Sequence, residues 1–424
     1  MALEPLMKDE KNMLEIVRVT LESVGHSIFN IVFIFGVWIV FLVNRRLYHI
    51  DIYRIIKKKS IFHVMADILV QSIIIGSIMS FIIVFVGVPL FFNAFLVFLI
   101  PISLLLSMIR IRFLDIHYSA ALISVMTLVL NGQHIGEYVL PNIETHIPSL
   151  MLLVGMLNVI KGLMIWLTQD QSVIPVLSRK NNQIVMGHII HKSWILPMGI
   201  LLLQIGELLT NGIQMPPWWP ILDYGYSQSV FFSMLPFVAM LSHNSISYTQ
   251  TLKNHKKQYV WSNLIIGSIM IVIGFFALHS LILQVAGTLM MIILPEAIHW
   301  MRLQKERKTP PIYSHPESGL RIMEVIDGGV ADELGMEMGE VIEKVNDTLI
   351  HDFKHFLRMI KDAKEQIVIE SRTISGRMIR YEIHKTKDLS RMGVRFIPEK
   401  PLITYSMENY NHIGLLDFLK GNYK

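Results

Sequence analysis

Cysteine is absent from this chain of 424 residues, and charged residues make up only 17% of it. Without cysteine, disulfide bonds, thiolate catalysis and zinc–thiolate sites are excluded. The remaining composition, 52% hydrophobic residues, is too apolar for a protein that lives in water. Charged residues are sparse between about residue 25 and residue 300 and frequent afterwards. The composition therefore predicts a membrane part followed by a soluble part.

Sequence motifs for common enzyme classes are missing as well. No H-E-x-x-H metalloprotease motif, P-loop or dinucleotide-binding glycine fingerprint occurs, and His188-Ile-Ile-His191 has neither the spacing nor the acid that a metalloprotease needs. Gly225-Tyr-Ser-Gln-Ser229 offers a serine without an identifiable base. We therefore expect no catalytic residues, no metal and no cofactor. The net charge of +5 comes from basic residues beside apolar runs, which argues against nucleic acid as a partner.

The apolar segments predict a multi-span α-helical membrane domain, because a helical span needs about 20 mostly apolar residues. Two of the segments, those ending at Leu130 and Leu241, are short enough to be re-entrant instead. We expect about nine spans: 25–43, 64–88, 90–108, 117–130, 149–168, 194–210, 229–242, 260–277 and 280–298.

Lysine and arginine are distributed very unevenly between alternate loops. One set of loops holds 18 basic residues and the other set, around Pro89, 131–148, 211–228 and His279, holds none. Basic loops stay in the cytoplasm, so the asymmetry predicts that the C-terminal part is cytoplasmic and the N-terminus external. A surface-lying helix fits the N-terminal residues equally well. The basic set is Arg45, Arg46, Arg54, Lys57, Lys58, Lys59, Arg110, Arg112, Arg179, Lys180, Lys192, Lys253, Lys256, Lys257, Arg302, Lys305, Arg307 and Lys308.

Two ionisable residues stand out inside the predicted spans. Lys161 lies about two thirds of the way through its span, and Glu207 lies near an outer end. Charges at such depth often mark transport pathways, but a lysine can also extend its long stem toward the membrane surface. At about 1.5 Å of rise per residue, the two would differ in depth by roughly 13 Å. Both a structural role and a polar path therefore stay open.

The chain divides into five predicted regions. They are an N-terminal amphipathic segment (1–24), a transmembrane domain (25–300), a basic linker (301–316), a cytoplasmic domain (317–400) and a C-terminal tail (401–424). In the cytoplasmic domain, Leu320 to Val325, Val341 to Val345, Gln366 to Ser371, Met378 to His384 and Met392 to Ile397 have strand character. Asp352 is placed to cap a helix that begins with Phe353.

This order of elements, with Gly319-Leu-Arg-Ile322, Gly329-Val-Ala-Asp-Glu-Leu-Gly-Met336 and Val345-Asn-Asp347, resembles bacterial PDZ domains, a small mostly-β (α+β) fold. The resemblance implies a groove between the first strand and the helix, to which a partner's peptide or C-terminus adds as a strand. The expected groove residues are Gly319, Leu320, Arg321, Ile322, Phe356 and Met359. A sheet edge filled by the protein's own tail or by loops is the alternative.

Several spans, a basic exit and one cytoplasmic PDZ domain are together similar to the MinJ family of bacterial division-site adaptors. The resemblance implies a multi-pass cell-membrane scaffold enriched at the septum and poles. It further implies that the protein links a MinD-like ATPase to a DivIVA-like scaffold and so regulates septum placement. Two other functions fit the same features: a PDZ-containing regulator of membrane proteolysis or envelope signalling, and a transporter using Lys161 or Glu207.

Overall fold

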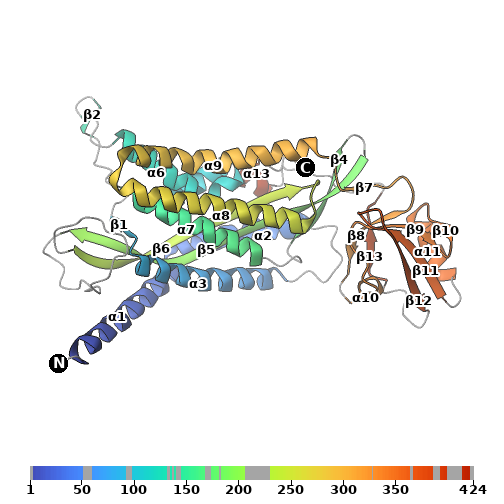
Figure 1. Cartoon of the computed structure of the whole chain (residues 1–424), viewed down its shortest axis with the longest axis horizontal. Coiled ribbons are helices and arrows are strands. Elements are labelled where there is room, and N and C mark those ends of the chain that lie inside the picture. The colour runs from blue at the N-terminus through green and yellow to red at the C-terminus, as the bar shows by residue number, and fades with distance from the viewer. Residues whose placement is uncertain are drawn as a thin grey trace.

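The computed structural model describes residues 3–50, 60–91, 98–130, 134–135, 138–139, 145–167, 173–180, 183–205, 230–326, 328–362, 366–384, 392–398 and 413–420. Long helices run beside a long β-hairpin, and a smaller sheet domain lies at one end of them (Figure 1). We call the described residues from Leu3 to Lys308 the membrane unit, and the described residues of 317–398 the C-terminal domain.

The membrane unit contains helices of very different lengths. Four helices of the described chain, α3, α7, α8 with its η3 extension, and α9, are long and apolar enough to cross a membrane. The bent pair α1 and α2, which meets at 55°, would make a fifth. These helices fit a membrane protein, while the number of spans stays a prediction. The helices are α1 (Leu3–Ile28), α2 (Ile31–Ile50), α3 (Ile61–Val86), α5 (Leu99–Ile109), η1 (Ile111–Leu114), α6 (Ile116–Leu130), α7 (Ile147–Leu167), α8 (Leu252–Phe276), η3 (Ala277–His279) and α9 (Leu281–Lys308).

Helix α3 shows how the apolar surface of the unit is arranged. Val70, Ile74, Ile78 and Ile82 recur every four residues and are all exposed, so they form one stripe along the helix. The opposite stripe, which includes Ser72, Gly76 and Ser80, is buried against the β-hairpin. An apolar outer face with small and polar residues inside is the arrangement expected for a helix in lipid.

The hairpin corrects two predicted spans. Residues 194–205 and 230–242, expected to be helical, belong to the antiparallel strands β5 (Gln183–Ile205) and β6 (Val230–Ser247), paired from His188–Ser247 to Ile205–Val230. Continuous apolar runs do not distinguish a buried strand from a helix. Pro197 and Pro236 lie inside these strands, where a helix would be broken.

Side chains of neighbouring helices satisfy backbone groups of the hairpin. In α3, Ser72 accepts a hydrogen bond from Ile195 N (3.3 Å) and Ser80 accepts one from Gly199 N (2.8 Å). Ser27 of α1 accepts from Phe237 N at 3.0 Å. β1 (Pro89–Phe91) pairs in parallel with β5 at Leu201 to Leu203. Backbone groups cannot find water inside a bilayer, so these partners allow strands to lie within the helical unit.

The C-terminal domain follows the predicted order of elements closely. Its sheet has the order β12-β11-β9-β8-β13, with β10 beside β9. α11 lies over the sheet, and its Asp352 cap accepts a hydrogen bond from His355 N (2.6 Å), as expected. The elements are β8 (Leu320–Val325), α10 (Val330–Glu333), β9 (Val341–Val345), β10 (Thr348–Leu349), α11 (Phe353–Asp362), β11 (Gln366–Arg372), β12 (Met378–His384) and β13 (Val394–Phe396).

Two segments tie this domain to the membrane unit. The predicted linker is helical up to Lys308, where α9 ends, and then forms β7 (Tyr313–Ser314). This strand pairs with Val185 and Met186 of β5, on the edge opposite to β4 (Ile174–Lys180). In the tail, α13 (Leu415–Lys420) returns to the membrane unit, where Phe418 is fully buried. Ile413 O accepts a hydrogen bond from Ile111 N (3.0 Å). The described part of the tail, residues 413–420, therefore packs against the chain itself.

Candidate functional site

The strand expected to border the peptide groove has no free edge. On one side β8 pairs with β9 at Leu320 and Arg321, and Ile322 N donates to Glu340 O. On its other side β8 pairs with β13, from Ile322 to Val325. A peptide therefore cannot add beside β8, and the predicted position of the groove is wrong.

The expected groove residues of this strand have structural positions instead. Leu320 and Ile322 are buried in the domain core, and Gly319 N donates to Ile350 O (3.1 Å). Arg321 donates to Ser314 O (2.7 Å) and Gly339 O (2.8 Å). Burial lowers the pKa of Arg321 from its ordinary value. These residues build the sheet and its connection to β7, so they are not available to a peptide.

The other edge of β13 faces α11. The ring of Phe396 lies 5.1 Å from the ring of Phe356 and 5.9 Å from that of Phe353. Phe356 belongs to the core, as does the half-buried Met359 beside it. By contrast, Phe353 and Leu357 are 50% and 39% exposed, and they lie one helical turn apart on the same face. We call the side of β13 that faces α11, together with Phe353 and Leu357 on the exposed face of that helix, the β13–α11 groove.

Of the expected groove residues on α11, Phe356 lies in the domain core and Met359 packs against it, while Phe353, Leu357 and Phe396 were not among those expected. The helix has more apolar residues than one core face needs, Phe353, Phe356, Leu357 and Ile360, and this excess was the available signal. The role of β13 was not readable from its sequence, because the strand is adjacent in space to β8, which precedes it by about 70 residues. Residues 385–391, which lead into β13, are outside the described residues.

The sheet order, the short helix after the first strand and the helix beside a terminal strand agree with the comparison to known families. Residues 321–373 match the PDZ domain family. This segment is a PDZ domain. No curated protein matches the chain. PDZ domains are protein-interaction modules that add a partner's extended peptide to an exposed sheet edge. In this domain the described edge beside a helix is that of β13.

Basic side chains lie along the groove helix. Lys354, Arg358 and Lys361 of α11 are exposed. Asp352, at the start of the helix, accepts a hydrogen bond from His355 N, which lowers the pKa of its carboxyl group. Because that carboxylate caps the N-terminus of α11, the helix surface next to the groove is predominantly positive.

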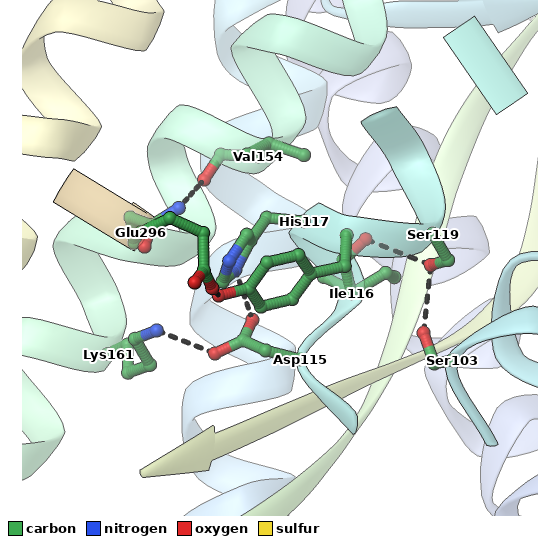
Figure 2. Close-up of polar contacts among 10 residues, drawn as sticks. Ser103, Asp115, Ile116, His117, Ser119, Val154, Lys161 and Glu296 are labelled. Atoms are coloured by element: carbon green, nitrogen blue, oxygen red, sulfur yellow. Dashed lines mark hydrogen bonds and ion pairs between the residues drawn. The ribbon is translucent and has the colours of Figure 1, made fainter. Parts of the chain in front are cut away.

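A second group of polar residues lies inside the membrane unit (Figure 2). Lys161 of α7 places its Nζ 2.6 Å from Asp115 Oδ2, and His117 Nδ1 lies 3.0 Å from Asp115 Oδ1. All three side chains are buried. The predicted deep position of Lys161 is thus balanced by a carboxylate from the turn between η1 and α6. Glu207, the other predicted polar residue, lies outside the described residues.

Next to this cluster, Glu296 of α9 joins two residues of the η1–α6 region. It pairs with Arg112 at 2.6 Å and accepts a hydrogen bond from Tyr118 at 2.6 Å. Together these contacts connect α6, α7 and α9. They give charged partners to the buried Asp115 and to the half-buried Glu296. Of the two roles that the sequence left open for Lys161, the pairing favours the structural one.

Histidines form a further buried group. His188 Nε2 lies 2.8 Å from His255 Nδ1, and His191 Nδ1 lies 3.1 Å from Asn244 Oδ1. Within the described ranges, however, no three His, Asp or Glu side chains are arranged to hold a metal ion. His188 thus contacts α8 through His255, and His191 contacts β6 through Asn244.

Proposed function

We propose that the protein is a non-enzymatic, membrane-anchored adaptor that captures an extended peptide in the β13–α11 groove. The observation that carries this proposal is the combination of a PDZ domain with one helix-flanked sheet edge that β8 leaves unpaired. The peptide would pair with β13 through main-chain hydrogen bonds, and an apolar side chain of the peptide would contact Phe353, Leu357 and Phe396.

The charge on α11 narrows the expected peptide. Lys354, Arg358 and Lys361 flank the apolar groove residues on an exposed helix surface. Complementary charge favours the right partner and disfavours others, even where it adds little affinity. We therefore propose that preferred peptides combine an apolar C-terminal residue with acidic residues upstream.

The finer role we propose is recruitment of division-site proteins, a MinD-like ATPase and a DivIVA-like scaffold, at the inner face of a bacterial cell membrane. Its support is the architecture, namely apolar helices, basic loops and one PDZ domain. Confinement to the membrane raises the local concentration of such an adaptor, so modest affinity for each site is sufficient. Imaging of a functional fluorescent fusion tests this role. Uniform membrane signal in dividing cells, with normal septa after gene deletion, would contradict it.

Peptide capture itself is tested on the full-length chain in lipid nanodiscs with a displayed library of random C-terminal peptides. Leu357→Asp places a charge in the groove and should abolish selection of any consensus. Leu349→Asp is the matched control, because Leu349 is 51% exposed on β10, away from the groove. Equal selection by both variants would exclude the groove. A selected consensus that matches the C-termini of membrane proteases or envelope regulators would instead support the proteolysis or signalling function.

A further inference from the structure

The C-terminal domain packs on the sheet of the membrane unit through a buried cluster of its own. Its members come from both units: Leu177, Ile184 and Met186 from β4 and β5, Tyr313 from β7, and Met323 and Ile397 from the C-terminal domain. All six are at most 9% exposed. This cluster, which we call the docking cluster, is separate from the core that holds the PDZ fold together.

Main-chain hydrogen bonds reinforce the docking cluster. Ile312 N donates to Tyr248 O at the end of β6, and His315 N donates to Ile184 O, each at 3.0 Å. Arg321 then holds Ser314 O of β7 and Gly339 O of the domain at the same time. Gly339 has a positive φ of 94°, and a Cβ there would collide with the Tyr313 ring. The linker is therefore a shared strand that fits closely against both units.

One strand connects the docking cluster with the groove. Phe396, the last residue of β13, contacts the groove helix through Phe353 and Phe356. The next residue, Ile397, is in the docking cluster, and its N–H donates to Arg321 O (3.0 Å). Movement of β13 on the groove side thus moves a residue that is buried against the membrane unit.

The end of the tail also contacts the membrane unit. Ile413 and α13 return to the membrane unit, where Phe418 lies in a cluster with Val43 of α2 and Ile189 of β5. A Cβ on Gly414 would collide with Met108 O. The domain is therefore attached on both sides, by β7 before it and by the tail after it.

We propose that docking of the C-terminal domain on β4 and β5 controls how well the β13–α11 groove is ordered. The affinity for a peptide and the strength of docking are then coupled. This regulation rests on the proposed peptide-binding function. Coupling between two sites is reciprocal in free energy. Docking would order β13 for a peptide, and a bound peptide would strengthen docking next to β5. β5 continues without a break from Ile184 and Met186 into the hairpin between the membrane helices.

The test reads the mobility of the groove without any peptide, so its result is independent of whether a peptide is found. Leu177→Ala removes docking-cluster volume from β4. Val176→Ala is the matched control, because Val176 is its neighbour, is also fully buried, and lies in the cluster with α13 instead. Hydrogen exchange is followed by mass spectrometry on the full-length chain in nanodiscs.

We expect Leu177→Ala to accelerate exchange of residues 392–398 by about tenfold or more, since truncation of a buried leucine is costly and local opening follows that cost. Val176→Ala should leave the exchange rates of these amides within about twofold of the parent rate. In β11, which contributes to the core of the domain, both variants should leave exchange within the same limit. Equal effects of both variants on residues 392–398, or no effect of either, would overturn the proposal.

A disulfide distinguishes loss of docking from loss of folding. Val185 and Ser314 are register partners of β5 and β7, and facing residues of an antiparallel pair lie about 5 Å apart between Cα atoms, within the range that a disulfide spans. Val185→Cys with Ser314→Cys therefore introduces two cysteines into a chain that has no others. Its oxidation should restore slow exchange to the Leu177→Ala protein, and reduction should reverse this. Fast exchange that persists in the oxidised protein would contradict the proposal.

Discussion

The Nζ atom of Lys161 lies 2.6 Å from Oδ2 of Asp115, and both side chains are buried inside the membrane unit. The pair joins α7 to the turn that starts α6, across 46 positions of sequence. Removing one member of such a pair leaves an uncompensated charge, which costs far more than the pair contributes.

We therefore predict that Lys161→Met alone, or Asp115→Asn alone, lowers the free energy of unfolding by about 3 kcal/mol. The double variant should recover much of this loss, because neither charge is left unpaired. Denaturant unfolding in mixed micelles measures all three. Arg18→Met serves as control, since the Arg18–Glu22 pair is exposed and solvent screens it. Additive losses in the double variant would contradict the pairing.

The serines of α3 provide the second prediction. Ser72→Ala and Ser80→Ala should each destabilise the membrane unit by about 1 kcal/mol, because an amide of β5 loses its acceptor. Ser77→Ala is the control, since its hydroxyl donates to Ile73 O within the same helix. The same unfolding measurement applies. A control as destabilising as the two test variants would mean that the hairpin contacts are unimportant.

Glu340 gives a prediction for the PDZ domain. Its buried carboxylate accepts hydrogen bonds from Ser371 Oγ (2.5 Å), Tyr381 OH (3.1 Å) and Glu337 N (3.2 Å). Burial raises the pKa of Tyr381 to about 12, so its hydroxyl remains a donor at neutral pH.

Glu340→Gln replaces one accepting carboxylate oxygen by an NH2 group, which faces hydrogen-bond donors. The substitution should lower the free energy of unfolding of the domain by about 2 kcal/mol. Loss of protection at β11, followed by hydrogen exchange, measures the effect. The exposed Glu382→Gln is the control, and it should leave protection almost unchanged. A stable Glu340→Gln domain would show that the carboxylate is not required.

Asp352 gives a prediction of pH dependence. The hydrogen bond from His355 N favours the carboxylate in the folded state, so the folded pKa lies below the ordinary value. The cap therefore stabilises α11 fully above the unfolded pKa of about 3.9, and its contribution is lost as pH falls through the lower folded pKa. Between these limits the contribution declines with decreasing pH.

Amide exchange of the first turn of α11, corrected for the intrinsic rate, should accordingly increase relative to β11 below about pH 4. Asp352→Asn keeps a capping side chain that does not titrate in this range. It should remove the excess pH dependence of this turn. A variant that retains the parent's pH profile would assign the effect to another group.

Local sequence patterns predicted many of the secondary-structure elements of the C-terminal domain. The strand at Val341 to Val345 begins and ends where expected, and the helix starts after its Asp352 cap. Turns, caps and alternating side chains are properties of neighbouring residues, so they are visible in a single sequence. The groove was misplaced because strand order is non-local: β13 lies beside β8, and that pairing leaves β13, rather than β8, with the edge toward the helix.

In the membrane unit, the sequence by itself determined that long apolar segments exist and where the basic residues lie relative to them. Only the tertiary structure decided that two of those segments are strands. Apolarity specifies burial but not conformation, whereas the choice of a strand depends on hydroxyl partners from distant helices, Ser27, Ser72 and Ser80. The partner of Lys161 was undecided for the same reason, because the fold brings Asp115 to it from another element.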